Sequence, residues 1–328
     1  MREPANMFIF KAYRKPEDLN MAFEFSQLAR LSRIAASSIL MLGASCVASS
    51  AGTNPLEDFN SSQLTNDFRD QYSGVGSATV NIDVPYGLDD AQKYDVYLPE
   101  TRSNAPIIVM VHGGAWTGGD KEDDNVAKAK AGFFVAKGYI FVSLNYRLLP
   151  KSDPLIQAAD VALGIANIQK NAEKWDGDKN KIVLMGSGAG GHIAALLSSN
   201  PSLASDQGAT VWAGAVVLET AALNVPDIMA SNHDARYDTA FGSNAEFWED
   251  SSPTHLVHSS GVPILVVCST ESNEDTCARA NAFKQTADNA GVNVTVSPQS
   301  MSPWEVNSRV GVSTSYTDTI ASYIDALL

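Results

Sequence analysis

The chain has 328 residues, of which 45% are hydrophobic and 18% are charged, and its formal net charge at pH 7 is −14. This length and apolar content are enough for one large domain with a sizeable core. The acidic balance argues against binding to nucleic acid or to anionic membranes, because both are negatively charged and repel such a surface.

The N-terminal segment, residues 1–51, differs in composition from the rest of the chain. Arg30 and Arg33 precede a weakly apolar stretch that ends in small residues. This layout is typical of a secretory signal peptide, and it predicts a secreted or periplasmic protein with no stable membrane span after cleavage. A disordered or membrane-tethering N-terminus is the alternative, because the part before Met21 is unusually long for a signal peptide. Residues 52–76 are expected to be a linker.

Two cysteines remain once the N-terminal segment is removed, Cys268 and Cys277. In an oxidising compartment, a pair that closes so short a loop is expected to form a disulfide, with two buried thiols as the alternative. The sequence has no Cys-x-x-Cys spacing and no cluster of His, Cys and Asp with the spacing of metal ligands. We therefore predict neither a metal site nor a cofactor.

From residue 77 onward, strand-like and helix-like patterns alternate. The expected strands cover residues 78–84, 94–98, 106–111, 139–144, 181–186, 213–218, 263–267 and 293–298. The expected helices cover residues 124–137, 155–174, 193–197, 278–290 and 316–327. Such alternation predicts an α/β fold, with a mostly parallel central sheet, helices on both faces and an antiparallel pair at its start. We expect one domain over residues 77–328, with residues 219–260 as a cap insertion.

A glycine-rich turn after the strand at 181–186 carries the strongest local signal. The apolar run meets the turn and passes directly into a helical pattern, so the segment is predicted to form a strand, a sharp turn and a helix. A strained turn of this kind exposes a catalytic nucleophile above the sheet, and it needs small residues two before and two after that nucleophile. Gly186 and Gly190 occupy those flanks. The nucleophile position is therefore Gly188, where serine is absent.

Ser187 is the only hydroxyl next to Gly188. If Ser187 were the nucleophile, the small flanking positions would be Met185 and Ala189, and a methionine is expected to clash in so tight a turn. An ordinary polar residue is the favoured interpretation of Ser187. A fallback nucleophile is the alternative.

A second glycine turn follows the expected strand at 106–111. Gly113 and Gly114 stand there in tandem, and Trp116 follows closely. Tandem glycines let backbone N–H groups approach a ligand oxygen, and together with the N–H of Ala189 they would form an oxyanion hole. Trp116 would then form an aromatic wall of the same pocket.

The acid and the base of a catalytic triad should follow the nucleophile in chain order. Asp275 is the candidate acid, because it lies in a polar loop at the carboxyl end of an expected strand. A solvated loop residue is the alternative reading of Asp275. The base should be a histidine before the last helix, but no histidine exists after His258. His112 and His192 are interpreted as residues that pack the turns.

The motifs together resemble those of carboxylesterases of the hormone-sensitive-lipase and feruloyl-esterase-like type, which have the α/β-hydrolase fold. The matching stretches, in that family's order, are Tyr94-Asp95-Val96-Tyr97-Leu98-Pro99, His112-Gly113-Gly114-Ala115-Trp116, Asn145-Tyr146-Arg147-Leu148 and Gly190-Gly191-His192. The family usually reads G-D-S-A-G-G-H at the elbow, whereas here Ser187 replaces the acid and Gly188 the serine. Near the end, the family's S-H-x-E-V/I-N resembles residues 301–307, with Pro303 at the histidine position and Trp304 next to it.

The resemblance therefore implies a site that has lost two of its three triad members and kept both glycine turns. A serine hydroxyl is a poor nucleophile without a base, so either loss alone would remove most of the rate. We expect a non-catalytic pseudo-hydrolase that binds a small ester-like or carboxylate ligand between Trp116 and Trp304. The alternative is a low-turnover carboxylesterase that acts on carboxylic esters through Ser187 or another hydroxyl, and a purely structural or partner-binding role is the third possibility. The oligomeric state stays open.

Overall fold

A computed structural model of the chain describes residues 78–312 and 314–328, which belong to one compact unit. The expected signal peptide and linker lie outside these residues and stay predictions. Among the helices that the structure describes, none combines the length and the apolar character needed to cross a membrane.

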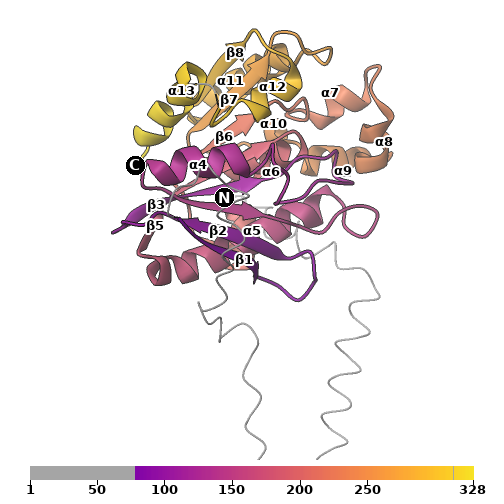
Figure 1. The fold of residues 1–328 in the computed structure, drawn as a ribbon. Helices are drawn as coiled ribbons and strands as arrows, with labels where there is room; N and C mark the ends of the chain where they lie inside the picture. Colours follow the sequence, from indigo (N-terminus) through magenta and orange to yellow (C-terminus); the bar gives the residue numbers. More distant parts are fainter. Residues whose placement is uncertain (1–77, 313) are drawn as a thin grey trace, which may run out of the picture. The chain divides into compact units, whose positions relative to one another are not determined.

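An eight-stranded sheet forms the centre of the fold (Figure 1). Its strands are β1 (Thr79–Pro85), β2 (Lys93–Leu98), β3 (Ala105–Val111), β4 (Ile140–Leu144), β5 (Gly177–Ser187), β6 (Gly214–Leu218), β7 (Ile264–Ser269) and β8 (Val294–Gln299). They lie in the order β1-β2-β4-β3-β5-β6-β7-β8. The pairs β1/β2 and β2/β4 are antiparallel and all others are parallel. The predicted mostly parallel sheet, with an antiparallel pair at its start, is confirmed.

The helices connect these strands. They are α4 (Lys128–Ala136), α5 (Pro154–Asn171), α6 (Ala189–Ser199), α7 (Val225–Met229), α8 (Ala235–Phe241), α9 (Ala245–Asp250), α10 (Pro253–Leu256), α11 (Thr276–Asn289), α12 (Pro303–Ser308) and α13 (Thr314–Asp325). Two 3-10 helices, η2 (Ala172–Trp175) and η3 (Pro201–Gln207), follow α5 and α6. The five expected helices are present, although α4 begins four residues later than predicted. Sequence reasoning missed α7 to α10 and α12, because helices of four to seven residues are too short to show a repeating apolar face.

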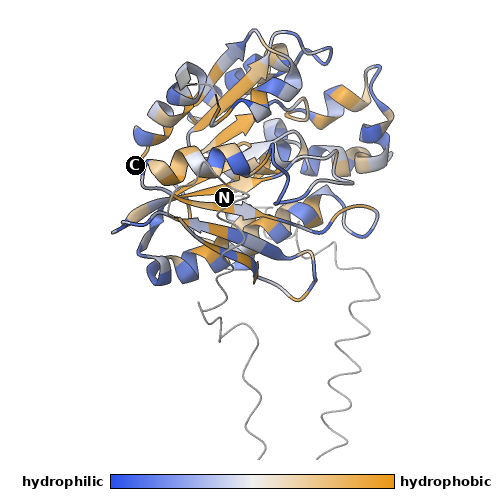
Figure 2. Cartoon of the chain, in the orientation of Figure 1, coloured by the Kyte–Doolittle hydropathy of each residue, from blue (hydrophilic) through white to orange (hydrophobic). Residues whose placement is uncertain are grey.

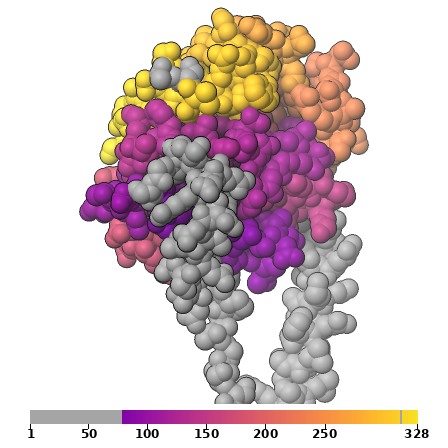
Figure 3. All heavy atoms as spheres, viewed as in Figure 1, coloured from indigo at the N-terminus to yellow at the C-terminus, as the bar shows by residue number. Residues whose placement is uncertain are grey.

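Helices cover both faces of the sheet. On one face, α4 and α13 pack against apolar side chains such as Met110 and Phe141. These two helices lie side by side in the space-filling view, α4 in magenta and the C-terminal segment in yellow (Figure 3). On the other face, Gly164 of α5 lies so close to Leu144 that a Cβ there would come within 2.3 Å of its side chain. The central strands, buried from both sides, are correspondingly the most apolar part of the chain (Figure 2).

The register of the parallel strands brings their carboxyl ends to one edge. Val111 at the end of β3 pairs with Gly186 of β5, and Ser187 pairs with Leu218 at the end of β6. Leu218 in turn pairs with Val267 of β7. The loops that follow these four strands therefore meet, which is where ligands bind in open α/β sheets.

The predicted disulfide is present. Cys268 in β7 is bonded to Cys277 in the first turn of α11, nine residues further along the chain. The bond closes the polar loop that contains Asp275, so it ties this loop to the sheet edge.

Replacing both cysteines, Cys268→Ala with Cys277→Ala, is expected to lower the free energy of unfolding by about 2–3 kcal/mol, because a loop of this length is then free in the unfolded chain. Urea unfolding of the variant and the wild type under oxidising conditions measures the loss. Under a strong reductant the two proteins should unfold at the same urea concentration. Equal midpoints under oxidising conditions would contradict the expected contribution of the bond.

Candidate active site

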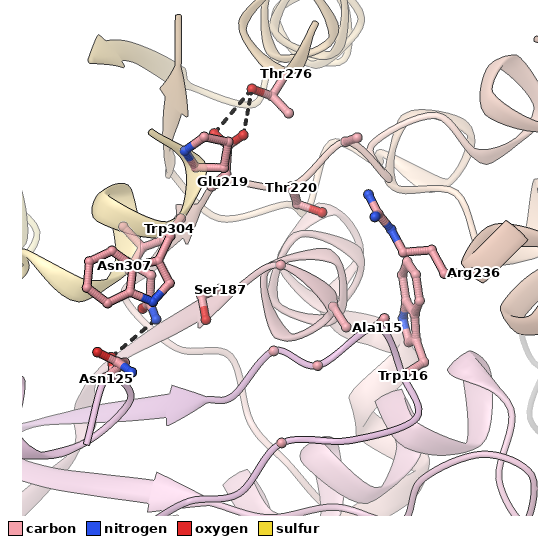
Figure 4. Close-up of a pocket in the computed structure, with 18 of the residues that line it drawn as sticks. Ala115, Trp116, Asn125, Ser187, Glu219, Thr220, Arg236, Thr276, Trp304 and Asn307 are labelled. Atoms are coloured by element: carbon pink, nitrogen blue, oxygen red, sulfur yellow. Dashed lines mark hydrogen bonds between the residues drawn. The ribbon is translucent and has the colours of Figure 1, made fainter. Parts of the chain in front are cut away.

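A cavity of about 710 Å³ opens at the carboxyl edge of the sheet. It is lined by the sequence-predicted residues Gly113, Gly114, Trp116, Ser187, Gly188, Ala189, Pro303 and Trp304. Figure 4 shows Trp304 and Trp116 on opposite sides, with Ser187 between them. Asp275 does not line this cavity; it is exposed and lines a neighbouring one. The tertiary structure therefore brings together every predicted site residue except the candidate acid and the disulfide.

The backbone at Gly188 has the strained geometry predicted for a nucleophile position. Its φ is 53° and its ψ is −116°, values that cost strain for any residue with a Cβ. Its N–H donates to the carbonyl oxygens of Leu218 (3.1 Å) and Glu219 (3.2 Å). A Cβ at Gly188 would meet only Gly113 Cα, at 3.9 Å, so the position has room for a side chain. The turn therefore has the predicted backbone shape with glycine at position 188.

The flanking glycines are required by close backbone packing. A Cβ on Gly186 would lie 2.2 Å from the carbonyl oxygen of Gly190. A Cβ on Gly190 would lie 2.2 Å from the carbonyl oxygen of Val111, at the end of the neighbouring strand. The need for small residues on both sides, predicted from the sequence, has this physical cause.

The substitution Gly190→Ala is expected to lower the free energy of unfolding by at least about 2 kcal/mol, since backbone atoms must move to accept the new methyl group. Gly118→Ala is the matched control, because a Cβ there would meet only Gly114 O, at 3.8 Å. Chemical denaturation of both variants measures the difference. Similar unfolding midpoints for the two would show that the close approach at Gly190 is not needed.

The backbone donors of the predicted oxyanion hole belong to residues that line the cavity. Gly114, Ala115 and Trp116 all have positive φ, at 121°, 53° and 61°, and this unusual run turns the chain tightly around the site. Within the described part of the chain, no acceptor pairs with the N–H groups of Gly113, Gly114 or Ala189. Ala189 is the first residue of α6, so its N–H is one of the donors that a helix leaves free. These N–H groups can receive a ligand oxygen.

Two buried histidines lie behind the turns and serve packing. His112 Nδ1 donates to the carbonyl oxygen of Gly113 (2.7 Å), and its ring stacks on Tyr146. His192 Nδ1 accepts from Trp116 Nε1 (3.3 Å) and its Nε2 donates to Ser251 O (2.7 Å). Burial lowers the pKa of both imidazoles, that of His192 to about 4. Neither ring lines the cavity, and no other histidine does among the described residues.

The buried imidazole of His192 makes stability depend on pH. The folded protein binds its proton only near pH 4, whereas an unfolded histidine binds it near pH 6.5, so stability falls as the pH drops between these values. The loss is expected to be roughly 3 kcal/mol at pH 4.

Comparing the pH dependence of wild type with that of His192→Gln checks this value, because the variant lacks the titrating group. His255→Gln is the control, since that side chain is exposed. The prediction fails if His192→Gln and the wild type lose stability in parallel as the pH falls.

The structure gives different surroundings to three residues at or beside the matched catalytic positions: Ser187, Pro303 and Trp304. The hydroxyl of Ser187 makes no hydrogen bond within the described residues, so no base is in place to take its proton. Pro303 begins α12, and Trp304 follows on the rim of the cavity with 64% of its surface exposed. The cavity stays open beside Trp304 and is not filled by it.

Sequence reasoning missed the charged and polar residues of the cavity, among them Glu219, Arg236, Tyr237 and Glu274. Glu219 follows β6 directly. On the far side of the cavity, Arg236 forms an ion pair with Glu274, and the hydroxyl of Tyr237 donates a hydrogen bond to the same carboxylate. Arg236 and Tyr237 come from α8 within the expected cap insertion. Glu219 follows a strand directly, whereas Asp275 lies at the end of the polar loop after β7. No cluster of three or more His, Cys, Asp or Glu that could hold a metal occurs within residues 78–312 and 314–328.

Comparison with known proteins assigns the family. The family model described as BD-FAE matches residues 94–286, more than half of the chain. The chain belongs to the BD-FAE family. This confirms the resemblance to hormone-sensitive-lipase and feruloyl-esterase-like carboxylesterases that the sequence motifs indicate.

Curated relatives of this BD-FAE protein include esterases. It is 30% identical over 227 residues to esterase LipQ of Mycobacterium tuberculosis, which covers 64% of this chain and 53% of LipQ. It is 35% identical over 115 residues to esterase LipC of the same organism, or 34% of this chain and 28% of LipC. Kynurenine formamidase of Salmo salar is 30% identical over 125 residues, 38% of this chain and 40% of that enzyme. The chain thus spans less than half the length of the latter two relatives.

Solved structures support the fold. A truncated carbohydrate esterase from gut microbiota aligns with a TM-score of 0.66 at 18% identity, covering 76% of this chain and 96% of that one. Thermogutta terrifontis esterase 2, phosphonylated by sarin, aligns with a TM-score of 0.60 at 19% identity, covering 77% of this chain and 95% of that one. At this level of identity the likeness establishes the α/β-hydrolase fold, as predicted.

Proposed function

We propose that this protein is a non-catalytic member of its esterase family, which binds an ester-like or carboxylate ligand in the cavity beside Gly188. One observation carries the proposal. The cavity keeps the backbone donors of an oxyanion hole, while Gly188 has no side chain and none of the described lining residues is a histidine. Binding groups are therefore retained where reacting groups are missing.

The size of the catalytic loss supports this proposal. Removing the serine or the histidine of a triad costs about 10⁶-fold in kcat, and the oxyanion hole with binding alone leaves roughly 10³–10⁴-fold over water. A protein with neither group at the matched positions would turn over an ester too slowly to serve as an enzyme.

The lining of the cavity indicates the chemistry of the ligand. The N–H groups of Gly113, Gly114 and Ala189 suit one carbonyl or carboxylate oxygen. Next to them, Trp116, Trp304 and Leu218 supply apolar surface for the acyl part. A ligand with a carbonyl oxygen on an apolar body meets both requirements.

A low-turnover esterase acting through Ser187 is the competing function. Its hydroxyl would need a base within hydrogen-bonding distance, and the described residues supply none. The disulfide supports an oxidising compartment for either function, in keeping with the secreted or periplasmic location that we propose.

Incubation of the purified protein with a fluorophosphonate probe is expected to give no covalent adduct, because such probes react with an activated serine. Intact mass spectrometry measures the labelled fraction. Gly188→Ser together with Pro303→His should label, since the double change returns both missing groups to a turn that still has room for them. The two single variants are the matched controls and should label far more slowly.

A stoichiometric adduct on the unmodified protein would overturn the non-catalytic proposal. Peptide mapping would then identify the serine, and loss of labelling in Ser187→Ala would establish the competing function. If the role is purely structural or partner-binding, a bulky residue in place of Ala189, which fills the cavity, should leave that role unchanged.

A further inference from the structure

Glu219 is the carboxylate that the structure holds most firmly at the cavity. It follows β6 with a φ of 48°, in the left-handed region that residues other than glycine rarely adopt. Its N–H donates to Val267 O (2.8 Å), and its carbonyl oxygen accepts from Gly188 N–H (3.2 Å). A strained backbone kept in place by two neighbouring elements is a feature that clusters at functional sites.

The side chain of Glu219 is anchored just as firmly. Its Oε2 accepts from Ser269 N–H at 2.6 Å, and the hydroxyl of Thr276 donates to Oε1 (3.0 Å) and Oε2 (3.2 Å) (Figure 4). Burial raises the pKa of the carboxyl, and these hydrogen bonds oppose the shift. The charged groups nearest to it include Glu274, which raises the pKa further.

Position 303 lines the same cavity as Glu219. Ser269, which binds Glu219 through its N–H, also donates its hydroxyl to Met301 O at 2.6 Å, two residues before Pro303. On the other side, Tyr316 donates to Val306 O (2.6 Å), three residues after Pro303. Burial raises the pKa of Tyr316, and the charge of Glu219 raises it further. Glu219 is thus connected through Ser269 to the segment just before position 303.

Asp275 offers a weaker alternative. Its side chain is exposed, does not cap α11, and lines the neighbouring cavity rather than the one that holds Gly188. Pro303 borders both cavities, so either carboxylate is near it in the fold. An exposed carboxylate is screened by water, whereas a half-buried one that is held by two donors, the Ser269 N–H and the Thr276 hydroxyl, keeps its direction and its field.

We propose that Glu219, and not Asp275, is the positioning carboxylate of this site: the group that would orient and charge-stabilise an imidazole at position 303. The proposal rests on the proposed function, because it concerns the acid that remains when the nucleophile and the base are lost. In a triad the acid holds the imidazole in the correct tautomer and stabilises the imidazolium that forms.

The first test measures the pKa of the imidazole introduced by Pro303→His in the full chain, by NMR titration. A neighbouring carboxylate stabilises imidazolium, so the pKa should lie at least about one unit above the ordinary 6.5. Adding Glu219→Gln should remove this rise, whereas adding Asp275→Asn, the matched control, should leave it. A pKa at or below 6.5 in Pro303→His, or loss of the rise with Asp275→Asn instead, would overturn the proposal.

The second test uses the labelling rate of Gly188→Ser with Pro303→His. Adding Glu219→Gln should slow labelling at least about 100-fold, and adding Asp275→Asn less than about 3-fold, because an unsupported imidazole loses its orientation. The reverse ranking would overturn the proposal. If Glu219→Gln fails to fold, the titration of Pro303→His with and without Asp275→Asn still distinguishes the two carboxylates. Loss of the pKa rise with Asp275→Asn would overturn the proposal, and a rise that persists would exclude Asp275 as its source. Labelling of the unmodified protein would refute the proposed function alone, since it says nothing about Glu219.

Discussion

The close approach of β5 and α6 to the end of β3 is the constraint on which the site depends. The turn between β5 and α6 passes very near the neighbouring strand. A Cβ on Gly190 would lie 2.2 Å from the carbonyl oxygen of Val111, so only glycine, which has no side chain, fits at this position. This contact presses the two glycine turns together, so the free N–H groups of Gly113, Gly114 and Ala189 face one cavity. Every other feature of the site is arranged around this pair of turns.

The shape of the turn at Gly188 does not depend on a side chain at that position. The conformation of Gly188 is held by backbone hydrogen bonds to the residues that end β6, and none of these bonds needs a side chain at position 188. A glycine there relieves strain that a serine would carry. The turn is therefore stable with glycine at position 188.

Charge at the cavity is distributed unevenly. Glu219 is fixed at the sheet edge by Ser269 and Thr276, while Arg236, Tyr237 and Glu274 bind one another on the side formed by α8. Trp116 packs against Tyr237 on the α8 side, with ring centroids 5.9 Å apart. The cavity that we propose binds an ester-like or carboxylate ligand thus combines unpaired backbone N–H groups with carboxylates that are already hydrogen-bonded.

The sequence by itself determined the fold class, the two glycine turns, the disulfide and the identity of the residues at positions 188 and 303. These features depend on local patterns, such as apolar runs, glycine spacing and chain order, which are visible without coordinates. Only the tertiary structure decided that Asp275 lies outside the cavity and that Glu219 lies inside it, because both carboxylates follow strands and look alike in the sequence. The difference arises from the pairing of β6 with β7, which places Ser269 and Thr276 within hydrogen-bonding distance of Glu219 from 50 and 57 residues away.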